Sequence, residues 1–86
     1  MSKRVDLSEE VYEWTKRHCH ISEEQIIGVV LHTPENERIY PDAEDPTRFE
    51  IHFNSCNKGH VLKILLKVHE RITEYMVYGA HCQNLS

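Results

Sequence analysis

Two pairs of side chains in the second half of the chain could move protons in general acid–base catalysis, for example at a phosphodiester bond. Such cleavage needs a base that deprotonates the attacking hydroxyl and an acid that protonates the leaving oxygen. His52 or its neighbour Glu50 could act as the base, and Tyr78 or His81 could act as the acid. All four lie on predicted strands or near their ends, so a sheet could bring them together.

The same reaction also needs cations, because negative charge builds up on the phosphorane as the bond breaks. Three basic side chains of this region could stabilise that charge, and together with one base and one acid they complete the predicted catalytic set. That set is His52, Lys63, Lys67, Arg48 and Tyr78. The alternative is a solvated sheet face, since any soluble sheet exposes residues of these types.

Metal binding is a second chemistry that the composition suggests, because the chain has seven histidines and three cysteines. The combinations are His18-Cys19-His20, Cys56 with His60, and His81-Cys82. Zinc sites use paired spacings such as C-x₂₋₄-C, and the sequence has no such pair. We therefore predict neither a metal nor a cofactor, and expect the cysteines to act as small apolar residues.

Two helices must precede the strands that carry these residues. Asp6 with Glu9 has the spacing of a capping box and predicts a helix over residues 7–19. Ser22 with Gln25 repeats that spacing and predicts a second helix over 22–33, which Pro34 ends.

After Pro34 the apolar period changes from three or four residues to two, which is typical of strands. Phe49, Ile51 and Phe53 alternate with polar residues, and the even positions of 60–69 are mostly apolar. The turn at 57–59 contains Gly59, and residues 35–45 form an acidic loop. The predicted strands are 38–40, 49–54, 60–69 and 72–78.

The predicted fold is therefore α+β, with two N-terminal helices packed on one face of a three- to four-stranded antiparallel sheet. The strand positions expected to face the helices are Phe49, Ile51, Phe53, Leu62, Ile64, Leu66 and Val68. The opposite face would show Arg48, Glu50, His52, Lys63, Lys67 and His69, and any chemistry would take place there.

Composition and charge limit the classes of function. The 86 residues predict one domain, 1–86, with no segment apolar enough to span a membrane and a cytoplasmic location. Residues 1–45 carry a net charge of −6, whereas residues 46–86 carry +2. The chain as a whole is a poor generic nucleic-acid binder, but its C-terminal half could present a local surface for anions.

Several strings resemble the BrnT-like relatives of the RelE/ParE toxin superfamily. They are His20-Ile21-Ser22-Glu23-Glu24-Gln25-Ile26, Val30 to Pro34-Glu35, Arg48, Gly59-His60-Val61-Leu62-Lys63-Ile64, and Ile72-Thr73-Glu74-Tyr75. Their order and spacing resemble an R-G-I-S-x-E-x-V helix start, an N-P helix end and a closing I-T-x-Y strand.

The resemblance implies a RelE-like sheet, a ribonuclease-type activity on RNA and an antitoxin-like protein partner. Relatives usually have His on the first helix and Arg before G-I-S, and Val11 and Cys19 stand at those positions here. We therefore expect a divergent toxin-type ribonuclease with weak or lost activity. The alternatives are a non-catalytic protein-interaction module, a small structural metal-binding domain, and self-pairing of exposed strand edges into a homodimer.

Overall fold

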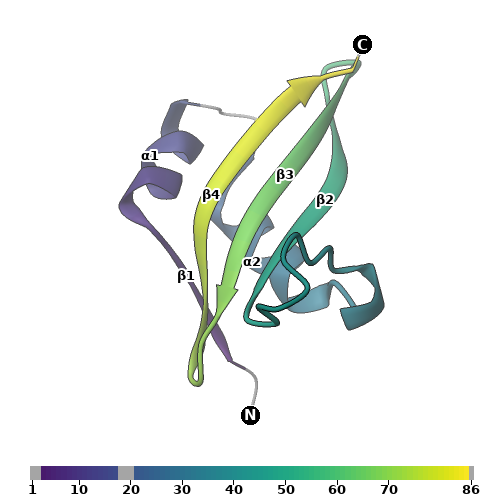
Figure 1. Cartoon of the computed structure of the whole chain (residues 1–86). Helices are drawn as coiled ribbons and strands as arrows, with labels where there is room; N and C mark the ends of the chain where they lie inside the picture. Colours follow the sequence, from purple (N-terminus) through teal and green to yellow (C-terminus); the bar gives the residue numbers. More distant parts are fainter. Residues whose placement is uncertain (1–2, 18–20, 86) are drawn as a thin grey trace.

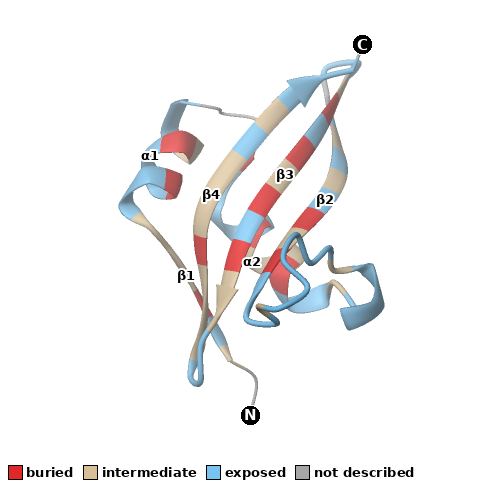
Figure 2. Ribbon diagram, viewed as in Figure 1, coloured by how far each residue is buried: buried red, intermediate tan, exposed pale blue. Residues whose placement is uncertain are grey.

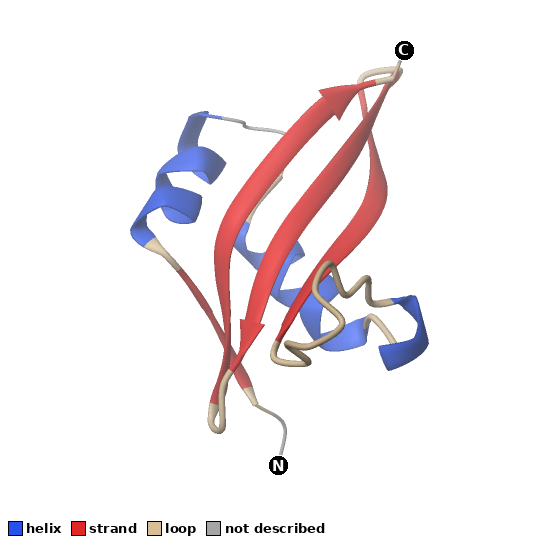
Figure 3. Ribbon diagram, viewed as in Figure 1, coloured by secondary structure: helices blue, strands red, loops and turns tan. Residues whose placement is uncertain are grey.

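The computed structural model describes residues 3–17 and 21–85 and has an α+β architecture with a four-stranded sheet (Figures 1 and 3). The elements follow one another as β1 (Arg4–Leu7), α1 (Glu9–Arg17), α2 (Glu23–His32), the 3-10 turn η1 (Glu35–Glu37), β2 (Arg48–Asn57), β3 (His60–Glu70) and β4 (Glu74–Asn84).

The sheet is mixed, which corrects the prediction of an antiparallel sheet. Its strand order is β1-β4-β3-β2, and the β2–β3 and β3–β4 pairs are antiparallel. β1 instead pairs with β4 in parallel, with Arg4 opposite Glu74 and Leu7 opposite Val77. This four-residue strand was not predicted, because its partner lies at the other end of the chain.

The first helix begins later than predicted, because Asp6 belongs to β1 and does not cap a helix. Ser8 takes that role: its hydroxyl oxygen accepts a hydrogen bond from the Val11 amide at 3.3 Å. The second capping box is confirmed, since the Ser22 side chain accepts from the Gln25 amide and the Gln25 side chain accepts from the Ser22 amide. Helix α2 then ends at His32, one residue before the Thr33 cap.

The two long hairpins follow the predicted pattern with shifted ends. Lys58 and Gly59 both have positive φ, 51° and 83°, as a two-residue turn between β2 and β3 requires. Ile72 was expected to begin the last strand but is 94% exposed in the second turn. β4 continues to Asn84, beyond the predicted end of the last strand at residue 78, and the Leu85 amide donates to the Val61 carbonyl.

The acidic connection between η1 and β2 contains one bridge in place of the predicted strand over 38–40. Ile39 and Glu50 exchange two backbone hydrogen bonds, at 2.9 and 2.7 Å. Farther on, the Asp42 and Asp45 side chains accept hydrogen bonds from the amides of residues two places ahead, which closes tight turns.

Both helices contribute to one core on a single face of the sheet. In Figure 2 buried and more exposed residues alternate along β3, and α2 lies behind the strands. The buried set is Val5, Val11, Trp14, Ile21, Ile26, Val30, Phe49, Ile51, Leu62, Ile64, Leu66, Val68 and Val77. The predicted inward register of β2 and β3 is therefore confirmed, with Phe53 only partly buried.

None of the helices in the described residues is long and apolar enough to cross a membrane.

Candidate functional site on the open face of the sheet

The side of β2, β3 and β4 that faces away from the helices is called the open face here. The strand registers arrange its residues in rows that run across the three strands. These rows are Arg48–His69–Met76, Glu50–Lys67–Gly79, His52–Leu65–His81 and Asn54–Lys63–Gln83. All residues expected on the helix-free side therefore lie there.

Glu50 and His52 form the most direct contact between the candidate proton-transfer groups. They lie two residues apart on β2 and so project from the same face. The His52 Nε2 atom is 3.2 Å from the Glu50 Oε1 atom. This contact fixes the orientation of the imidazole ring and leaves its second nitrogen for another partner.

The lysines lie on either side of the His52 row. Lys67 is opposite Glu50 and Lys63 is opposite Asn54, which makes both lysines diagonal neighbours of His52. Both are exposed, and neither has an ion-pair partner within 4 Å among the described residues. Their charges are therefore available to an anion from solution.

Arg48 and Tyr78 meet at one end of the open face. A β-bulge between Lys67 and Val68 leaves Tyr78 as the extra residue of β4. Its ring reaches the Arg48 guanidinium, whose central carbon lies 5.5 Å from the ring centroid. Arg48 also pairs with Asp45 at 3.5 Å. Tyr78 is thus a mid-strand aromatic residue at a bulge, beside a cation.

Gly79 lets the Lys67 side chain cross β4 closely. A methyl group at Gly79 would lie 3.1 Å from the Lys67 Cδ atom, closer than ordinary van der Waals contact. Beside this crossing is a depression of about 480 Å³, lined by Glu10, Leu65, Lys67, Tyr78, Gly79, Ala80 and His81. Glu10 reaches it from the first turn of α1.

The structure brings some of the predicted catalytic residues together and separates others. Glu50, His52 and Lys67 occupy neighbouring positions, and Arg48 touches Tyr78. His52 and His81 share a row, but β3 lies between their strands, so their backbones are about 10 Å apart. Their catalytic roles stay predictions.

The described residues contain no group of three or more His, Cys, Asp or Glu side chains that could hold a metal ion. Cys56 is a free, exposed cysteine, and His60 lies across the turn from it. The segment His18-Cys19-His20 lies outside the described residues.

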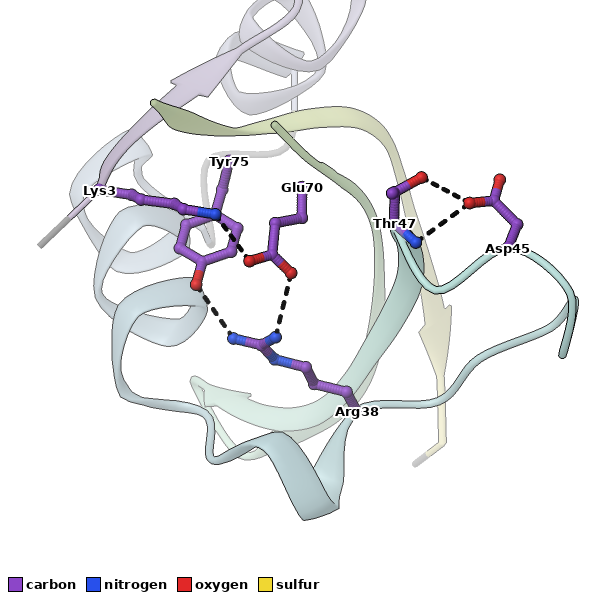
Figure 4. Close-up of polar contacts among 6 residues, drawn as sticks. All are labelled: Lys3, Arg38, Asp45, Thr47, Glu70 and Tyr75. Carbon is purple, nitrogen blue, oxygen red and sulfur yellow. Dashed lines mark hydrogen bonds and ion pairs between the residues drawn. The ribbon is translucent and has the colours of Figure 1, made fainter. Parts of the chain in front are cut away.

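A second polar cluster lies where the acidic loop meets the ends of β2, β3 and β4 (Figure 4). We call it the Arg38 corner; its residues are Lys3, Arg38, Phe49, Glu70 and Tyr75. Arg38 donates to the Tyr75 hydroxyl at 3.2 Å, and Glu70 pairs with Arg38 at 3.6 Å and with Lys3 at 2.7 Å.

The Arg38 guanidinium is nearly buried, with 12% of its side chain exposed, and its central carbon lies 4.4 Å from the Phe49 ring centroid. Burial lowers the pKa of Arg38, but contacts with the hydroxyls of Tyr40 and Tyr75 outweigh burial and leave the pKa above its ordinary value. Arg38 is therefore a permanent cation that helps to hold the acidic loop on the sheet.

Sequence reasoning identified neither Glu10 as a neighbour of the open face nor Arg38 as a packed residue. A glycine inside a strand was the available signal for the depression, because it often marks a bulge or a close approach. Nothing local indicated the position of α1 beside β4.

Comparison with known proteins gives no match to a family model, a curated protein or a solved structure.

Proposed function

We propose that the open face binds single-stranded RNA, and that the chain is a divergent RelE/BrnT-like domain with weak or no ribonuclease activity of its own. The observation that carries this proposal is that Lys63 and Lys67 are exposed on a helix-free surface and have no ion-pair partner among the described residues. Charges that the fold does not use internally are free to bind phosphates.

The distribution of charge supports an anionic ligand. The chain has a net charge of −4, yet the rows of the open face contain three cations and only one carboxylate, Glu50. A cationic surface on an acidic protein steers an anion to that surface in particular. Tyr78 adds an aromatic ring, on which an unpaired base can stack, as in other proteins that read single strands on a sheet.

The same geometry explains why strong cleavage is not expected. General acid–base cleavage places the base and acid on either side of one scissile bond, within hydrogen-bond reach of the atoms they serve. His52 and the candidate acids stand on strands separated by β3. Val11, at the position where relatives have His, is 1% exposed in the core and offers no proton.

Binding is tested with a fluorescently labelled single-stranded RNA of nine nucleotides, followed by anisotropy. Three phosphate contacts predict a salt slope of about −2, or about 20-fold weaker binding at 200 mM than at 50 mM salt. Lys63→Ala and Lys67→Ala should each weaken binding. The matched control is Lys16→Ala, which removes an exposed lysine from α1. Equal losses in all three variants would contradict a site on the open face.

Cleavage is tested by incubating the same RNA with the protein and by expressing the chain in growing cells. We expect no cleavage above that of the His52→Ala variant, and no growth arrest. Growth arrest that His52→Ala or Lys67→Ala abolishes would overturn the weak-activity part of the proposal and assign a catalytic role to the open face.

A second candidate function is protein interaction through the outer edge of β2. Apart from the bridge between Ile39 and Glu50, this edge has no strand neighbour within the described part of the chain. Such an edge can accept a strand from an antitoxin-like protein or from a second copy. Light scattering measures the mass in solution, and a monomer at high concentration would exclude the homodimer.

A further inference from the structure

The depression beside Tyr78 is large enough to hold a nucleobase and has side chains that could bind one. Its volume is about 480 Å³, and its lining combines an aromatic ring, an aliphatic side chain, a cation and a carboxylate. The groups are Tyr78, Leu65, Lys67 and Glu10, with Gly79 between them. A base can stack against the ring and the apolar floor while its edge meets the polar groups.

The depression contains the carboxylate of Glu10, which differs from Glu50 of the open face because the Glu50 carboxylate already contacts His52. Glu10 is exposed, and it makes no ion pair within 4 Å with any described cation. An acidic side chain beside a phosphate-binding surface weakens the binding of phosphate. Glu10 also lies in the first turn of α1, where a carboxylate stabilises the helix. Toward an RNA ligand it favours a part that donates hydrogen bonds.

Among the four RNA bases, guanine alone presents two adjacent donors on its Watson–Crick edge, N1–H and the N2 amino group. A carboxylate accepts both through its two oxygens, in a charge-assisted bidentate arrangement. Adenine and cytosine each present one donor beside a ring-nitrogen acceptor, which faces the carboxylate unfavourably. Uracil presents one donor between two carbonyl oxygens, which face it unfavourably as well.

We propose that this depression is a guanine subsite in which Tyr78 stacks on the base, Glu10 reads its Watson–Crick edge and Lys67 contacts the adjoining phosphate. The inference rests on the proposed RNA binding by the open face and names the base that this face prefers. Gly79 contributes by leaving room for the Lys67 stem, which lies within 3.1 Å of the position of a Cβ atom there.

The test compares nine-nucleotide RNAs that differ only at the central base. They contain guanine, inosine, adenine or uracil within a run of uridines, and their binding is measured by anisotropy at constant salt. The wild type should bind the guanine RNA about ten-fold more tightly than the adenine RNA, as expected for hydrogen bonds to a charged group. Inosine keeps N1–H but lacks the N2 amino group, so its affinity should lie between those two.

Glu10→Gln should reduce the preference for guanine to less than about three-fold without weakening the binding of the all-uridine RNA. Glu9→Gln is the matched control, because Glu9 is an exposed carboxylate of the same helical turn that does not line the depression. It should keep the full ten-fold preference. Circular dichroism of both variants confirms that α1 is intact.

The outcomes separate this inference from the function on which it rests. Salt-dependent binding with equal affinity for all four RNAs would overturn the guanine subsite and leave RNA binding intact. An equal loss of preference in Glu9→Gln and Glu10→Gln would also overturn it, since the effect would then come from net charge. Absence of binding by every RNA would overturn the proposed function as well.

Discussion

The Arg38 corner and the open face are built from the same kinds of residue but differ in how those residues are paired. In the corner, Arg38 contacts an aromatic ring, a hydroxyl and a carboxylate, and that carboxylate also binds Lys3. On the open face, Lys63 and Lys67 are exposed, with no ion-pair partner in the described residues. Both regions combine arginine, tyrosine, lysine and glutamate.

This difference shows that residue type alone does not separate a structural cluster from the proposed binding surface. Removing a cation that is desolvated and paired inside the fold is costly, because its partners lose their counter-charge. Arg38 is such a cation, although its buried Nε atom has no hydrogen-bond partner among the described residues. A cation that remains in solvent contributes little to stability but can exchange its water for phosphate. Substitutions in the two regions should therefore have opposite effects on unfolding and on RNA binding.

The largest effect on stability is expected at the aromatic base of the corner. Phe49 is 1% exposed and lies beneath Arg38 and beside Tyr75. Phe49→Ala should lower the free energy of unfolding by about 3–5 kcal/mol, because it removes a buried ring and leaves a cavity. Denaturant unfolding measures the loss. His52→Ala, on the same strand but facing outward, should change stability by less than about 0.5 kcal/mol.

The next effect separates the two arginines. Arg38→Ala should cost about 1–3 kcal/mol, because it leaves the Tyr75 hydroxyl and part of the Glu70 charge without their partner. Arg48→Ala removes an exposed ion pair with Asp45 and should cost less than about 1 kcal/mol. Chemical denaturation of both variants gives the two values, and similar losses would show that the corner is not the more tightly packed region.

Local patterns predicted the parts of this fold that depend on neighbouring residues. Ser22 and Gln25 lie three residues apart and cap the start of α2. The alternation of apolar and polar residues around Ile64 specifies which side of β3 faces the core. For the same reason, period-two spacing was enough to predict that Lys63 and Lys67 share the open face. Each of these features is decided by residues a few positions apart.

The remaining features depend on contacts between distant segments. The parallel pairing of β1 with β4 joins the two ends of the chain, so Asp6 resembled a helix cap when read alone. The burial of Arg38 requires the acidic loop to fold onto Phe49 and Tyr75. Glu10 approaches the open face because α1 begins directly after β1, and β1 is held beside β4. Local periodicity contains no information about such placements.

A smaller effect is expected on RNA binding when a lysine of the open face is replaced. Lys67→Ala should weaken binding of the nine-nucleotide RNA about five-fold at 100 mM salt and lower the salt slope by about 0.7, as expected for one lost phosphate contact. Its free energy of unfolding should stay within about 0.5 kcal/mol of wild type. Arg38→Ala should show the reverse, with unchanged affinity under conditions where it remains folded.

The smallest effect is expected at Asp45, which lies between the two regions. The amide and hydroxyl of Thr47 both donate to its carboxylate, and these hydrogen bonds hold the pKa of Asp45 below its ordinary value. Because the folded-state pKa is the lower one, the carboxylate stabilises the fold above its unfolded pKa of about 3.9, and this contribution disappears as pH falls through the folded pKa. Asp45→Asn should therefore unfold at a slightly lower temperature than wild type at pH 7, with the difference vanishing in strong acid.

The same substitution removes the partner of Arg48, so RNA binding at pH 7 should become slightly tighter. A variant that lost both stability and affinity would place Asp45 and Arg48 within the packed part of the molecule, and the boundary between the two regions would have to be redrawn.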